Sequence, residues 1–167
     1  MLVNKYKFST NFASVIDTFP YTMCIILMPF AGLLADRIGK RMTIILFCGA
    51  TNILQHVYSM LHPECNQCNS ALVPYFLQGI NSTIYGVITF GMIPYLVKPQ
   101  LCGTAYGLLT CADNFASVVI DPTIAFIHDR TGGYFWVEVA FTTLFVISFI
   151  LKFWLYKWDQ KKRGGIL

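Results

Sequence analysis

The chain has 167 residues, of which 56% are hydrophobic and only 12% charged, with a formal net charge of +4 at pH 7 and a mean hydropathy of +0.58. A soluble globular domain carries roughly 25% charged residues, so this composition excludes a soluble protein and makes the lipid bilayer the expected partner. The small positive charge gives no reason to expect a nucleic-acid partner.

Five segments are long and apolar enough to cross a membrane. The hydrocarbon core of a bilayer is about 30 Å thick, so a spanning helix needs about 20 mainly apolar residues. The predicted helices cover residues 12–35, 42–61, 71–97, 103–127 and 133–156. We therefore expect an all-α membrane protein in which residues 1–167 form a single helical domain.

The connection after the first predicted helix, residues 32–41, is a short charged turn that contains two glycines, GLLADRIGKR. Charges this dense cannot lie in hydrocarbon, so the turn marks a membrane surface where the chain reverses direction. It resembles the G-x-x-x-D-R-x-G-[RK]-[RK] loop of the major facilitator superfamily of secondary transporters. Every defined position is filled, by Gly32, Asp36, Arg37, Gly39, Lys40 and Arg41.

This resemblance implies that the charged turn works as a conformational latch. Asp36 is expected to meet the positive end of a neighbouring helix dipole, and Arg37 to pair with carboxylates or carbonyls on the same face. Lys40 and Arg41 are expected to hold the orientation of the chain in the membrane. The alternative is a turn that sets topology and has no gating role.

The same family resemblance predicts where the chain lies in a larger fold. Superfamily members resemble two six-helix halves, each built from inverted three-helix repeats, with the charged loop after the second helix of each half. Here the loop follows the first helix, so the five helices match the last five of a twelve-helix fold. We expect a partial C-terminal transporter domain, or a truncated gene model, whose missing N-terminal half is a further partner.

The third predicted helix carries polar side chains at helical spacing, among them Gln78, Ser82 and Tyr85. Gln78 and Tyr85 are candidate substrate-binding residues, because amide and hydroxyl groups can bind peptide backbone or peptide termini. The alternative is that these groups hydrogen-bond to other helices, as polar residues commonly do in membrane bundles.

The fourth predicted helix carries two carboxylates within the apolar stretch. Asp113, Ser117 and Asp121 recur every four residues and therefore share one helix face, and Asn114 lies beside Asp113. Ionisable groups at membrane depth are costly and usually functional, so Asp113, Asn114 and Asp121 are candidates for substrate or proton binding. A structural network with other helices is the alternative.

Glu138, near the start of the fifth predicted helix, is a further candidate for substrate or proton binding. Together with Asp17, His56 and Asp121 it places four titratable groups in the same half of the membrane. Such a set could sense or exchange protons with an acidic compartment. The sequence does not decide whether these groups face one another.

Residues near the last two predicted helices narrow the resemblance. The segments 101–108 (LCGTAYGL), 129–135 (DRTGGYF) and 137–139 (VEV) are similar to a lysosomal dipeptide transporter branch of the superfamily. That resemblance implies dipeptides as substrates, a lysosomal or endosomal membrane, and an accessory membrane glycoprotein as a possible partner. Residue chemistry alone selects no substrate, so sugars, organic ions, or a non-transporting structural partner remain alternatives.

Basic residues predict the orientation of the chain. They gather in the connections after the first and third helices and in the C-terminal tail, whereas the opposite side holds only Lys5, Lys7 and Arg130. The positive-inside rule then places the C-terminus in the cytosol and the N-terminus in the lumen or exterior.

No enzyme activity, cofactor or metal site is expected. Neither Asp113 nor Asp121 lies in the G-x-G-D context of an intramembrane aspartyl protease. The cysteines lack the ligand spacing of a zinc site, although Cys65 and Cys68 could form a local disulfide in an oxidising lumen.

Overall fold

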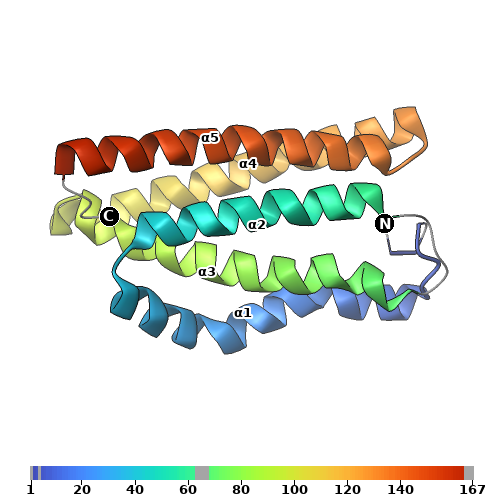
Figure 1. Ribbon diagram of the computed structural model, residues 1–167, viewed down its shortest axis with the longest axis horizontal. Helices are drawn as coiled ribbons and strands as arrows, with labels where there is room; N and C mark the ends of the chain where they lie inside the picture. The colour runs from blue at the N-terminus through green and yellow to red at the C-terminus, as the bar shows by residue number, and fades with distance from the viewer. Residues whose placement is uncertain (1, 4, 63–67, 164–167) are drawn as a thin grey trace.

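The computed structural model describes residues 2–3, 5–62 and 68–163, and all regular structure in that part is helical (Figure 1). The predicted Cys65–Cys68 pair includes Cys65, which lies outside the described residues. The elements in chain order are α1 (Thr10–Ile38), α2 (Arg41–Leu61), the 3₁₀ turn η1 (Asn69–Leu72), α3 (Val73–Leu96), the 3₁₀ turn η2 (Pro99–Leu101), α4 (Cys102–Thr131) and α5 (Phe135–Arg163). This architecture confirms the predicted all-α class with five long helices.

The helices lie side by side along the long axis of the molecule (Figure 1). Helix α3 packs between α1 and α2, and α2 packs in turn against α5, while α4 contacts α5 and α3. Two ends of the bundle follow from this arrangement. One end holds the N-terminal segment, the last turn of α2 and the first turns of α3 and α5. We call it the N-terminal end, and we call the other the opposite end.

Helix α1 extends past its predicted end at residue 35 because a glycine stops it later. Gly39 adopts a left-handed backbone with φ of 69°, and its N–H donates to the Ala35 carbonyl at 3.0 Å. Glycine is the residue that takes this conformation without a Cβ penalty. As a result, Asp36 and Arg37 belong to the last turn of α1, and only Gly39 and Lys40 link α1 to α2.

Helix α4 is also longer than its predicted range of 103–127, since the next left-handed glycine is Gly132, with φ of 66°. Helix α5 runs to Arg163 rather than to residue 156, because its last turns are polar but contain no helix-breaking residue. Helix α1 is bent in Figure 1 and has Pro20 and Pro29 inside it, each of which removes a backbone donor.

Four of the described helices are long and apolar enough to span a membrane: α1, α2, η1 with α3 (Asn69–Leu96), and α5. Helix α4 is long but less apolar than these four, since Asp113, Asn114 and Asp121 interrupt its middle. None of its described residues is buried within this chain. The side chains of Asp113, Asn114 and Asp121 have no hydrogen-bond or ion-pair partner among the described residues.

Close packing between α1 and α3 depends on a glycine. A Cβ added to Gly79 would lie 3.1 Å from the Cα of Pro20 and 3.3 Å from the Cβ of Met23. Small residues of this kind let membrane helices approach closely. This contact fixes α3 in the position from which Gln78, the residue before the glycine, reaches α2.

Candidate functional site

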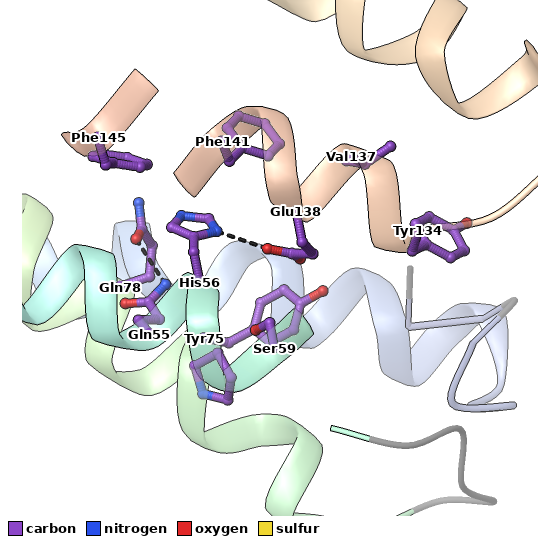
Figure 2. Close-up of a pocket in the computed structure, with 11 residues that line it drawn as sticks. Gln55, His56, Ser59, Tyr75, Gln78, Tyr134, Val137, Glu138, Phe141 and Phe145 are labelled. Atoms are coloured by element: carbon purple, nitrogen blue, oxygen red, sulfur yellow. Dashed lines mark hydrogen bonds and ion pairs between the residues drawn. The ribbon is translucent and has the colours of Figure 1, made fainter. Parts of the chain in front are cut away.

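A pocket of about 350 Å³ lies between α2, α3 and α5 at the N-terminal end of the bundle (Figure 2). It brings together Gln78 and Glu138, two of the side chains that the sequence nominates for binding. The lining residues are Gln55, His56, Ser59, Pro74, Tyr75, Gln78, Tyr134, Val137, Glu138, Phe141 and Phe145. A pocket of this volume lies within the range of small-molecule sites, which is ~300–1,000 Å³.

An ion pair that is buried within the bundle forms one wall of this pocket. The Nδ1 atom of His56 on α2 lies 2.8 Å from Oε2 of Glu138 on α5, and the two side chains are only 15% and 8% exposed. The imidazole also stacks on Phe145 and Phe141, with ring centroids 4.9 and 5.4 Å away. These rings fix the plane of the imidazole and hold Nδ1 toward the carboxylate (Figure 2).

An amide pair between α2 and α3 lies beside the ion pair. Gln55 Nε2 donates to Gln78 Oε1 at 3.0 Å. Gln55 is only 6% exposed, and its own Oε1 is buried without a hydrogen-bond partner among the described residues. A buried acceptor without a hydrogen bond lowers the stability of the fold. A donor from outside the described residues would remove this penalty.

The N-terminal segment covers the same end of the bundle. Lys5 Nζ donates to the Ser59 carbonyl at 2.9 Å, and the adjacent Tyr6 is 2% exposed. Burial raises the pKa of the Tyr6 phenol, and the negative charge of Glu138 raises it further. Tyr6 therefore stays neutral at physiological pH and adds no charge beside the carboxylate.

The nominated residues of α4 do not join this pocket. Asp113, Asn114 and Asp121 are all exposed on the surface of this chain, and the backbone carbonyl of Asp113 accepts a hydrogen bond from Ser117 Oγ at 3.2 Å. Helical spacing places Asp113 and Asp121 on one face. Their role in substrate or proton binding stays a prediction.

Tyr85 lies apart from the pocket, next to a lysine that the sequence analysis missed. Lys152 Nζ of α5 is 4.7 Å from the centroid of the Tyr85 ring, a cation–π distance. The signal for Lys152 was present in the sequence, since it is a charged residue within the predicted fifth helix. The binding role predicted for Tyr85 is likewise neither supported nor opposed by this contact.

The charged turn joins three helices at the opposite end of the bundle, and Arg41 makes the contacts. Arg41 Nη2 donates to Asp36 Oδ1 at 2.8 Å, Nη1 donates to the Gly91 carbonyl at 3.5 Å, and the guanidinium lies 4.3 Å from the centroid of the Tyr95 ring. These contacts tie the end of α1 and the start of α2 to the end of α3. The sequence predicted for Arg41 a role in membrane orientation, and these contacts add a structural one, while its part in a latch stays a prediction.

The side chain of Arg37, which was predicted to pair with carboxylates or carbonyls on this face, is exposed and forms no hydrogen bond or ion pair with another described residue. Its part in the latch, together with those of Gly32, Gly39 and Lys40, stays a prediction.

Replacing Arg41 or Asp36 with Ala is expected to slow transport by the full-length protein that carries this chain, at nearly normal abundance. Contacts that differ between two conformations shift an equilibrium by ~1–3 kcal/mol, or about 5–150-fold. Initial uptake rates, normalised to protein in the vesicles, measure the effect. Lys98→Ala is the matched control, because it removes an exposed positive charge that follows α3 and lies outside the latch motif. Normal rates in both Arg41→Ala and Asp36→Ala would mean that the turn sets membrane topology and has no role in gating.

Sequence reasoning identified Glu138 and Gln78 but not the pocket around them. His56 was noted as a titratable group in the same half of the membrane, and Gln55 and Tyr75 were missed. The spacing of Gln55 and Ser59 on the second predicted helix, with His56 next to Gln55, was the available signal. It puts polar groups near one helix face, but does not show which helix they meet.

Comparison with known proteins adds independent information. The family model described as Major Facilitator Superfamily matches residues 1–166 of the chain. The lysosomal dipeptide transporter MFSD1 of Gallus gallus is 26% identical over 96% of this chain and 37% of its own length. The proteins of the same name from Homo sapiens and Danio rerio are 26% and 23% identical over 97% and 98% of this chain, and over 34% of their own lengths.

This chain therefore spans about a third of the length of the curated relatives that it matches. No solved structure matches it.

Proposed function

Because the chain belongs to the Major Facilitator Superfamily, we propose that it forms part of a secondary transporter that carries dipeptides across a lysosomal membrane by alternating access. The observation that carries this proposal is the family match over residues 1–166. The choice of dipeptides rests on the similarity to lysosomal dipeptide transporters MFSD1. The family membership points to a transporter and not to an enzyme.

The distribution of polar groups supports transport rather than a purely structural role. Ionisable residues within membrane-spanning helices usually mark substrate or ion pathways. Here they occur as a buried His56–Glu138 pair and as two carboxylates, Asp113 and Asp121, on an exposed face of α4. An exposed polar face is unfavourable against lipid, so we propose that α4 borders the translocation cavity, which the N-terminal half of the transporter completes.

The orientation and the partners belong to the same proposal. The positive-inside rule places the opposite end of the bundle, with Lys40, Arg41 and the C-terminal tail, in the cytosol. The pocket near Glu138 then faces the lumen, and Asp36 and Arg41 act as a cytosolic latch. An accessory membrane glycoprotein is a further proposed partner, by analogy with the dipeptide transporter branch.

Uptake by proteoliposomes that contain the full-length protein with this chain tests the proposed function. We expect labelled dipeptides to enter faster than into protein-free vesicles, and unlabelled dipeptides to compete. Labelled sugars and organic cations serve as the comparison substrates. Dipeptide flux equal to that of protein-free vesicles would refute the peptide assignment. If no solute enters, a non-transporting structural role becomes the better account.

A further inference from the structure

The pocket between α2, α3 and α5 has an excess of hydrogen-bond acceptors. A carboxylate offers about four lone-pair positions, yet His56 is the one hydrogen-bond or ion-pair partner of the Glu138 side chain among the described residues. Gln55 Oε1 accepts no hydrogen bond from any described residue, and Gln55 is only 6% exposed. Both residues line the pocket, so a ligand that brings N–H or O–H donors is complementary to it.

The remaining walls favour a cation with an apolar substituent. Tyr75, Tyr134, Phe141 and Phe145 surround the polar groups (Figure 2), and aromatic faces attract organic cations. An anionic ligand would meet the Glu138 carboxylate, which repels it. A neutral apolar ligand would leave the Gln55 oxygen unpaired. We therefore propose that this pocket binds a small primary ammonium ion that carries an apolar or aromatic group.

The ion pair at the pocket makes binding depend on protons. His56 is positively charged only when protonated, and one carboxylate is fully compensated by one cation. A bound ammonium next to an imidazolium would suffer like-charge repulsion. A bound ammonium and a protonated His56 therefore compete for the same Glu138 carboxylate, so that protonation of His56 opposes binding.

Other groups near the pocket do not change this competition. The phenols of Tyr6, Tyr75 and Tyr134 and the charges of Lys5 and Asp17 lie on the surrounding elements. Lys5 Nζ is held by the Ser59 carbonyl, and Tyr6 stays neutral because burial raises its pKa. Asp17 is exposed on α1. Two further imidazoles at this end, His62 and His128, pack against Tyr6 and Tyr134 but do not line the pocket.

Phenethylamine is a suitable probe, and 2-phenylethanol is its uncharged counterpart of nearly the same shape. Isothermal titration of the full chain in detergent micelles should show phenethylamine binding at neutral pH at least about tenfold more tightly than 2-phenylethanol, because hydrogen bonds to charged groups are the stronger ones. Affinity should fall at acidic pH.

Three variants locate the bound amine. Glu138→Gln should remove the preference for the amine over the alcohol, and Gln55→Leu should weaken amine binding while the His56–Glu138 pair stays intact. Asp129→Asn is the matched control, since its carboxylate is 81% exposed and lies outside the pocket. It should bind like the parent.

Equal affinity for amine and alcohol, no binding of either by the folded parent, or unchanged amine binding in both Glu138→Gln and Gln55→Leu would overturn the proposal. No binding at all would mean that water satisfies the two acceptors. This readout does not require transport, so it stands or falls separately from the dipeptide assignment.

Discussion

Replacing Asp113 with Asn is expected to remove most transport by the full-length protein, at least about tenfold, while folding and abundance stay close to normal. Asn keeps the size and hydrogen-bonding capacity of the side chain but removes its charge. Asp113 is exposed in this chain, so the substitution should cost little stability. The loss of rate follows if the carboxylate faces the cavity, where opposite charge on a substrate or proton would couple to it by ~1–3 kcal/mol.

Initial uptake rates across acidic and neutral pH are the measurement for Asp113→Asn, and a changed pH profile is part of the expectation. Asp121→Asn should have a milder effect, because Pro122 follows it and indicates a partly structural role. Asp129→Asn on the same helix controls for the loss of an exposed negative charge. If Asp113→Asn transports like the parent at every pH, its carboxylate has no role in recognition.

Breaking the His56–Glu138 pair from one side is expected to destabilise the protein by about 3–5 kcal/mol. His56→Leu leaves a carboxylate that is only 8% exposed without its side-chain partner. Removing both charges with His56→Leu and Glu138→Leu together should recover most of the stability, because the double variant has no uncompensated buried charge. Equilibrium unfolding in mixed micelles, followed by tryptophan fluorescence, gives the free energies.

The pair His128–Asp129 provides the matched control for this experiment. Its side chains are 32% and 81% exposed, with Nδ1 and Oδ1 3.6 Å apart. Pairs of this kind contribute about 0–1 kcal/mol, so His128→Leu should change stability little. If His56→Leu is as mild as His128→Leu, the buried pair is not a structural tie between α2 and α5.

The sequence specified the class of the protein because its signals are local. Runs of about 20 apolar residues predict spanning helices, and the charged turn at residues 32–41 predicts a membrane surface and a family. The all-α class and the family are confirmed, by the helical bundle and by the family match over residues 1–166, and four of the five predicted helices are long and apolar enough to span a membrane. Helix ends were less accurate. Apolar content marks the hydrocarbon core, whereas Gly39 and Gly132 mark where α1 and α4 stop.

The candidate site depended on contacts that no local pattern contains. Glu138 and Gln78 could be nominated because polar groups stand out within apolar helices. The partner of Glu138 is 82 positions away in the chain, and the partner of Asp36 is Arg41 rather than a helix end. Helical periodicity shows which residues share one face of a helix, but it does not show which other helix that face contacts.

Composition and periodicity by themselves thus determined that this chain is a membrane helix bundle, and the motif determined its family. Only the tertiary structure decided that α2 carries His56 and Gln55 to α5 and α3, and that Asp113 and Asp121 are left on an open face. The physical reason is that helix formation and membrane insertion depend on neighbouring residues, whereas the choice of partner helix depends on the packing of whole surfaces.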